Sequence, residues 1–176
     1  NKSEISIEMG VILDFCSLWQ KGNGEKDKRT VAQIQEFVDG LSEIDTPYAH
    51  CEITAVKLTA VPAEVTKTYY DRGWTLFESI IIDGKAASQR LQLFNWLTID
   101  EKFGSQSFQN DRSSLGGHPI EYLARGKRAP PCTPERFKQM LDERQARAIQ
   151  KGVTLFTSGS DQPFVIDKFR AAFEEL

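Results

Sequence analysis

The spacing of apolar residues predicts helices at several points of the chain. In residues 30–44 apolar side chains recur every three or four positions, which is the period of an amphipathic helix, and Thr30 is a candidate N-cap. The stripe consists of Val31, Ile34, Phe37, Val38, Leu41 and Ile44. A second helix is predicted from Tyr70 to about Gly84. A third is predicted over 133–152, where Thr133 caps, Pro134 takes the first position and Gly152 ends the helix. A last helix follows the turn "SGSDQP", with Ser160 or Asp161 as its cap.

Short apolar, β-rich runs between these helices predict strands. They are residues 5–15, which contain Asp14 near their end, 51–62, 90–99 and 153–157, although periodicity alone does not exclude a helix over 90–99. Strands that alternate with helices indicate a mostly parallel sheet with right-handed crossovers and helices on both faces. We therefore expect an α/β sandwich of three layers with four or five strands, formed by residues 1–176 as one domain. Residues 100–132 are polar and broken by Gly and Pro, so we expect a long irregular insertion there.

Composition and charge exclude several classes of protein. The chain is 40% hydrophobic and 27% charged, with a formal charge of −3, and its basic residues are spread out. We therefore expect no nucleic-acid partner, because such proteins need clustered positive charge. No apolar run approaches the roughly 20 residues of a membrane span, so no membrane association is expected. Cys16, Cys51 and Cys132 form no CxxC pair, which favours a reducing, intracellular compartment.

The predicted sheet directs attention to the carboxyl ends of its strands, since ligands of parallel α/β sheets bind there. Asp14 and Thr59 lie near the carboxyl ends of two of these strands, and Ser158, Gly159 and Asp161 follow another. The last group precedes a helix N-terminus, where backbone N–H groups can bind phosphate, but the sequence favours an ordinary turn with a Ser or Asp cap. His50 and His118 have no partner at metal-ligand spacing, so no metal site is predicted.

Glu78 is the main candidate for chemistry, because it lies in the apolar stretch "GWTLFES". Helical spacing places it one turn from Trp74, Thr75, Ile81 and Ile82. A carboxylate at such a position loses water, which raises its pKa and suits it to act as a general base or to stabilise a developing cation. The alternative is a structural glutamate at the edge of the core, paired with Arg72 or Lys85, or reaching solvent.

The segment "WTLFES" resembles the W-C-x-x-E-L signature of Toll/interleukin-1 receptor (TIR) domains, which have a flavodoxin-like fold. Thr75 stands for the usual Cys and Ser79 for the usual Leu. The segments "VILDFCSL" and "CEITAVKLTAVP" resemble the second and third strands of that family, and "QKGNGEKDK" lies where its mobile loop follows the second strand. The resemblance covers residues 5–84. The first strand of the family is not visible, so we expect the chain to be a fragment that lacks it.

The resemblance implies an intracellular signalling domain that recognises a nucleotide. Some TIR-like domains cleave the nicotinamide–ribose bond of NAD with the glutamate of this motif, which makes Glu78 the expected catalytic residue. The related nucleoside deoxyribosyltransferases also use a glutamate at an N-glycosidic bond. Expected substrate contacts are Asp14, Thr59, Arg72, Trp74, Ser158, Gly159 and Asp161, with NAD as substrate and no cofactor. The alternatives are a non-catalytic interaction module that self-associates or binds other proteins, and a structural subunit of a larger assembly. Whether the chain is an enzyme therefore stays open.

Overall fold

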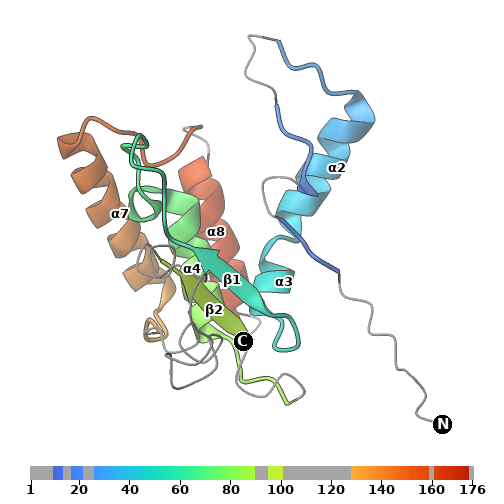
Figure 1. The fold of residues 1–176 in the computed structure, drawn as a ribbon, viewed down its shortest axis with the longest axis vertical. Coiled ribbons are helices and arrows are strands. Elements are labelled where there is room, and N and C mark those ends of the chain that lie inside the picture. Colours follow the sequence, from blue (N-terminus) through green and yellow to red (C-terminus); the bar gives the residue numbers. More distant parts are fainter. Residues whose placement is uncertain are drawn as a thin grey trace, which may run out of the picture. The chain divides into compact units, whose positions relative to one another are not determined.

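The computed structural model describes residues 10–13, 17–21, 26–89, 95–100, 128–158 and 161–174 (Figure 1). Contacts between Cα atoms divide the chain into two compact units, Asn1–Ile44 and Asp45–Leu176. Each unit has its own elements and its own polar contacts.

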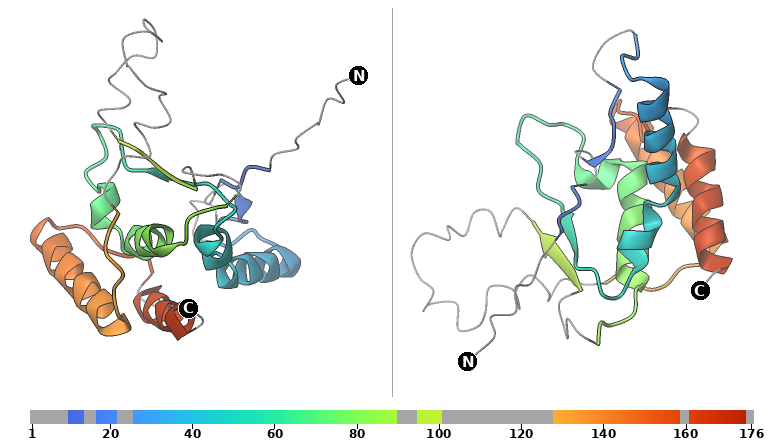
Figure 2. Two further views of the ribbon diagram at one scale, coloured as in Figure 1. Left: turned by 90° about the horizontal axis from the view of Figure 1, so that it is seen from below. Right: turned by 90° about the vertical axis from the view of Figure 1, so that its right-hand side faces the viewer.

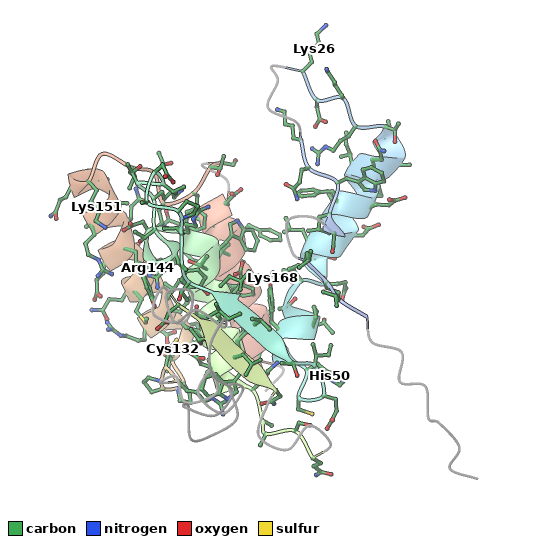
Figure 3. The ribbon with its side chains drawn as sticks, in the orientation of Figure 1. Lys26, His50, Cys132, Arg144, Lys151 and Lys168 are labelled. Carbon is green, nitrogen blue, oxygen red and sulfur yellow. The ribbon has the colours of Figure 1, made fainter. Side chains whose placement is uncertain are left out.

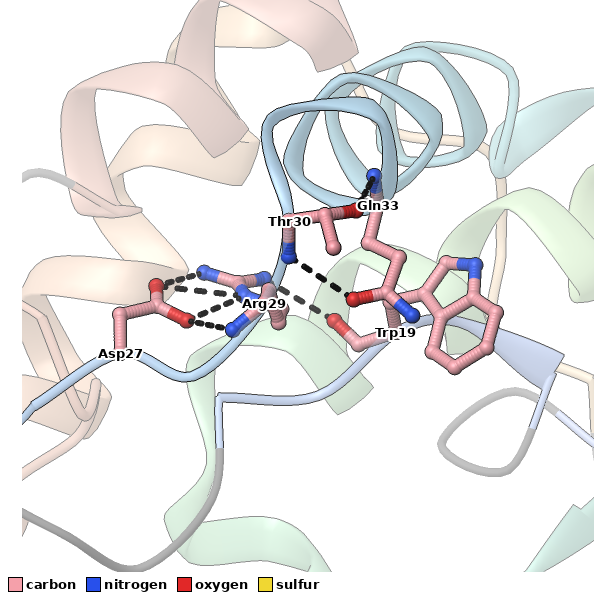
Figure 4. A network of polar contacts seen from close by, with 5 residues as sticks. All are labelled: Trp19, Asp27, Arg29, Thr30 and Gln33. Atoms are coloured by element: carbon pink, nitrogen blue, oxygen red, sulfur yellow. Dashed lines mark hydrogen bonds and ion pairs between the residues drawn. The ribbon is translucent and has the colours of Figure 1, made fainter.

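The first unit contains helix α2 (Val31–Ser42). Thr30 caps it as predicted: the Thr30 hydroxyl accepts from the Gln33 backbone N at 3.2 Å, and the Gln33 side chain accepts from the Thr30 backbone N at 2.9 Å. This reciprocal capping box satisfies N–H groups that the first helical turn leaves free. Arg29 precedes the cap and binds Asp27 at 2.7 Å and the Trp19 carbonyl at 2.9 Å (Figure 4). These contacts join the segment before α2 to the start of the helix.

The strand expected over residues 5–15 is absent at the four positions that the structure describes. Residues 10–13 adopt no strand, and the side chains of Val11, Ile12 and Leu13 are exposed. A strand needs a partner for its backbone groups, and residues 10–13 pair with no strand in the described part of the chain. The other residues of this expected strand, including Asp14, lie outside the described residues.

The second unit contains a parallel sheet of β1 (Ala55–Leu58) and β2 (Trp96–Ile99). Ala55 pairs with Trp96 and Leu58 with Ile99. The described residues therefore confirm a parallel α/β arrangement, whereas the expected four or five strands are not shown. Residues 101–127 of the expected insertion lie outside the described residues, and 128–132 form neither helix nor strand.

The strand predicted over 153–157 is wrong. The Val153 N–H donates to the Ala148 carbonyl at 2.9 Å, and the Leu155 carbonyl accepts from the Gly73 N–H at 3.1 Å. These backbone groups are hydrogen-bonded to residues at the ends of two helices. The segment therefore packs between helix ends instead of pairing with a strand of the sheet. Leu155 and Phe156 are buried there, as their composition suggests. A Cβ at position 73 would overlap the Phe156 ring, so only glycine fits this approach.

The helices of the second unit are α3 (Asp45–Ala49), the 3-10 turn η1 (Tyr69–Asp71), α4 (Gly73–Gly84), α7 (Pro134–Gln150) and α8 (Asp161–Glu174). They lie on one side of the two strands (Figure 2). On the other side, Val56 is 46% and Leu58 61% exposed. The expectation of helices on both faces of the sheet is therefore not met by the described residues of this unit.

Helix α4 lies between the sheet and the other long helices, and this position gives it two buried faces. Ile82 packs with Ala55 and Trp96 of the sheet. Phe77 lies edge-on to Phe137 of α7 and to Phe169 of α8, with ring centroids 6.4 and 6.5 Å apart. The Phe137 and Phe169 rings stack at 4.2 Å.

The predicted caps of α7 are confirmed. The Thr133 hydroxyl accepts from the Arg136 backbone N at 3.3 Å, and Pro134 is the first helical residue. Gly152 follows the helix with a positive φ of 68°, a conformation that glycine adopts without strain. Among the described residues, no helix is both long enough and apolar enough to cross a membrane.

Candidate functional site

Glu78 lies on α4 and is half-buried. Its neighbours one turn away face different partners. Trp74 approaches Phe164 of α8, with ring centroids 5.9 Å apart, whereas Ile82 packs against the sheet. By helical geometry Glu78 therefore lies between the side of α4 that faces α8 and the side that faces the sheet. This position removes part of its hydration without burying the carboxylate in the core.

A group of hydroxyls occupies the next position around α4, and its central member, Tyr69, is not among the residues predicted from the sequence. The Tyr69 hydroxyl lies 2.8 Å from the Ser79 hydroxyl, and the Thr75 hydroxyl donates to the Tyr69 carbonyl at 2.5 Å. Thr75 and Ser79 are the two positions at which the chain departs from the W-C-x-x-E-L signature. The side chains at both of these positions therefore hydrogen-bond to Tyr69, which precedes the helix.

Burial raises the pKa of Tyr69 to about 12, and the nearby charge of Glu78 contributes to the shift. Only 8% of Tyr69 is exposed. A phenol with this pKa stays protonated at neutral pH, so the Tyr69 hydroxyl that meets Ser79 is neutral. Glu78 thus lies within electrostatic reach of a protonated tyrosine hydroxyl that is hydrogen-bonded to Ser79.

The structure brings together Trp74, Ser158 and Asp161, three of the predicted substrate residues. The Trp74 indole N–H donates to the Asp161 carboxylate at 3.4 Å, and the Asp161 N–H donates to the Ser158 carbonyl at 3.2 Å. Asp161 is the first residue of α8, and its carboxylate faces the start of α4. Gly159 lies outside the described residues, as does Ser160.

The remaining predicted residues have other contacts. The N–H and hydroxyl of Thr59 both donate to the Ile99 carbonyl, at 2.9 and 3.1 Å, which closes the carboxyl end of the sheet. Arg72 is exposed, and its guanidinium donates to the Lys67 carbonyl at 3.4 Å. Lys85, the alternative partner of Glu78, donates to the backbone carbonyls of Ile53 at 2.8 Å and His50 at 3.4 Å.

Burial lowers the pKa of Lys85 to about 8, and the Arg128 guanidinium adds to this effect. Lys85 is 5% exposed, and among the described residues its amine is held by carbonyl oxygens rather than by a carboxylate. Cys51 contributes a smaller, opposite effect on the same amine. Lys85 follows the C-terminal end of α4, whereas Trp74 lies near its N-terminal end. The Lys85 amine is therefore not part of the region around Glu78.

A buried ion pair joins α4 to the sheet and was also missed. The Lys57 ammonium lies 2.5 Å from the Asp83 carboxylate, and the two side chains are 8% and 5% exposed. The Asp83 carboxylate also accepts from the Ala129 N–H at 3.0 Å. Arg128 donates to the Asp83 carbonyl at 2.7 Å and to the Lys85 carbonyl, so it binds the last carbonyls of α4.

No family model, curated protein or solved structure matches this chain. The resemblance to TIR domains therefore stays a prediction that depends on the residues quoted above. Among the residues that the structure describes, no group of His, Cys, Asp and Glu side chains is arranged to hold a metal ion. Cys51 and Cys132 are free thiols, and Cys16 lies outside the described residues.

Proposed function

We propose that this chain recognises a nucleotide and cleaves the N-glycosidic bond of NAD, with Glu78 as the catalytic residue. The observation that supports this proposal is the half-buried position of Glu78, one turn from Trp74 and within electrostatic reach of the protonated Tyr69. The proposal also includes the TIR-like signalling role that the resemblance implies.

The chemistry required of Glu78 is electrostatic. When nicotinamide leaves, the ribose carbon acquires oxocarbenium character, and a carboxylate close to it stabilises that positive charge. A carboxylate that has lost part of its water does this more strongly, because the effective dielectric constant is lower. Water then adds to the ribose carbon and releases a proton, so NAD and water give nicotinamide, ADP-ribose and a proton.

The test measures nicotinamide release from NAD by the wild type and by Glu78→Gln. Glutamine keeps the shape of the side chain and removes its charge, so we expect release to fall by about 100-fold or more. Glu64→Gln is the matched control, since Glu64 is exposed and lies outside the site. Release that survives in Glu78→Gln would show that another group performs the reaction.

A second candidate is a non-catalytic module that self-associates. It is favoured by the outer face of the sheet, where Val56 and Leu58 are 46% and 61% exposed. These two neighbouring apolar side chains give a second copy of the chain a surface on which to pack. Sedimentation of the wild type and of Leu58→Lys tests this function: association that is unchanged in the variant would argue against this face.

A further inference from the structure

Basic side chains gather around η1 and the C-terminal half of α7, although the chain as a whole is acidic. Arg144 donates to the Arg72 carbonyl at 3.0 Å, Arg72 donates to the Lys67 carbonyl at 3.4 Å, and the Lys151 ammonium lies 2.7 Å from the Asp71 carboxylate. We call this group the basic cluster, and its members are Lys67, Arg72, Arg144, Arg147 and Lys151. Arg144 and Lys151 extend from α7 and the residue after it (Figure 3).

The Asp71 carboxylate lies within the basic cluster and already has bonding partners there. Asp71 is 6% exposed, and besides Lys151 it accepts from the Thr68 hydroxyl at 2.8 Å. Glu143, the acid beside Arg144 in sequence, forms its ion pair with Arg136 at 3.1 Å. Asp71 therefore offsets part of the positive charge of the basic cluster, in which basic side chains still outnumber the carboxylates.

The electrostatics of the basic cluster agree with this description. The pKa of Arg144 is lowered first by burial and then by the charge of Arg147. The pKa of Lys67 is lowered first by burial and then by the charge of Arg72. Like charges held close together raise the local potential and attract anions. Guanidinium groups also match phosphate in geometry, because they donate two parallel hydrogen bonds to its oxygens.

The basic cluster adjoins the region of Glu78 through Tyr69. The pKa of Tyr69 responds both to Glu78 and to Arg144, so this residue lies within electrostatic reach of each. The next residue, Tyr70, is 62% exposed, and the Arg144 guanidinium lies 6.0 Å from its ring centroid. Helix α4 begins in the same place, and its N-cap residue Arg72 makes no capping bond with its side chain. The positive end of the helix dipole lies here as well, although the Asp161 carboxylate also faces the start of α4.

We propose that the basic cluster binds the phosphate groups of a nucleoside diphosphate, with Arg72, Arg144 and Arg147 as the principal contacts. The pyrophosphate of a dinucleotide such as NAD has this chemistry, so the proposal names the ligand class of the site around Glu78. This inference depends on the proposed function in one respect, the position of the ribose, which would lie toward Tyr69 and Glu78.

The experiment is calorimetric titration of the full chain with ADP, inorganic pyrophosphate and adenosine. We expect ADP and pyrophosphate to bind and adenosine to bind at least about tenfold more weakly, since one charge-assisted phosphate contact corresponds to roughly that factor. Arg147→Gln and Arg72→Gln alter exposed side chains and should each weaken ADP about tenfold. Arg136→Gln, on the same helix but paired with Glu143, is the matched control and should leave ADP binding unchanged.

The outcomes separate this inference from the proposed function. If adenosine binds as tightly as ADP, or if both cluster variants bind ADP like the wild type, the basic cluster is not the phosphate site. If ADP binds through the basic cluster but NAD releases no nicotinamide, the inference stands and the catalytic proposal fails. If nicotinamide release depends on Glu78 and its KM for NAD is unchanged in both cluster variants, the catalytic proposal stands and the inference fails.

Discussion

The buried pair of Lys57 and Asp83 gives the most specific prediction about stability. Their charged atoms are 2.5 Å apart, and both side chains are less than one tenth exposed, at 8% and 5%. Removal of one partner leaves the other as an uncompensated charge in a region of low dielectric constant, which typically costs about 3–5 kcal/mol. Replacement of both partners by apolar residues of similar volume is often close to neutral.

The contacts of the pair predict which single substitution is worse. In Lys57→Met the Asp83 carboxylate keeps the Ala129 N–H as a donor at 3.0 Å, so we expect a loss near the lower limit, about 3 kcal/mol. In Asp83→Leu the Lys57 ammonium loses its carboxylate and the Ala129 N–H loses its acceptor, so we expect about 4–5 kcal/mol. Among the described residues, the Lys57 ammonium then keeps the Trp96 ring, whose centroid lies 5.9 Å away.

Urea unfolding of the wild type, the two single variants and the double variant Lys57→Met/Asp83→Leu completes a double-mutant cycle. We expect the double variant to lie within about 2 kcal/mol of the wild type, which implies a coupling energy of several kcal/mol between the two sites. Additive losses, with each single variant below about 1 kcal/mol, would show that the two charges are not buried together as the structure has them.

Three further predictions concern stability. Phe137→Ala should cost about 3–5 kcal/mol in urea unfolding, because Phe137 is 0% exposed and stacks on Phe169; a loss below 1 kcal/mol would contradict this packing. Hydrogen bonds from Lys151 and then Thr68 lower the pKa of Asp71 to about 2, below its unfolded value of about 3.9. The contribution of Asp71 to the stability of the fold is therefore present above pH 4 and is lost as the pH falls toward 2. Asp71→Asn should therefore narrow the difference in unfolding free energy between pH 5 and pH 3, and an unchanged difference would refute the assignment. The pKa of Lys85, about 8, is below its unfolded value of about 10.4, so the unfolded chain binds more protons between these values and the contribution of Lys85 to stability rises over this range. Thermal melts of Lys85→Met from pH 7 to 10 should lack this rise, and melts that parallel the wild type would exclude Lys85 as its source.

Local sequence signals predicted the helices well. The capping box at Thr30 and the cap, proline and glycine of α7 act within a few residues of each other, so they can be recognised without knowledge of the fold. The strand at 153–157 was predicted wrongly from equally clear local composition. Its backbone partners, Ala148 and Gly73, belong to helices, and one of them is distant in sequence. Whether a segment forms a strand thus depends on its backbone hydrogen-bonding partners, which the sequence of that segment alone does not show.

The candidate site shows the same division between local and distant signals. Helical spacing correctly predicted that Glu78 is partly buried and one turn from Trp74. The basic cluster could not be seen in the sequence, because Arg72 and Arg144 are 72 positions apart, whereas a dense basic run in the sequence lies elsewhere, at Arg125, Lys127 and Arg128. The role of Tyr69 depends on a contact with Ser79 across the start of α4.

The central claim is that Glu78 acts on the ribose bond while other residues hold the phosphates. The most direct test measures nicotinamide release from NAD and ADP affinity in the same variant, Glu78→Gln. Because the carboxylate would act at the ribose carbon and not at the phosphates, we predict that release falls about 100-fold or more while the Kd for ADP stays within about twofold of the wild type. Release at the wild-type rate in Glu78→Gln would contradict the account.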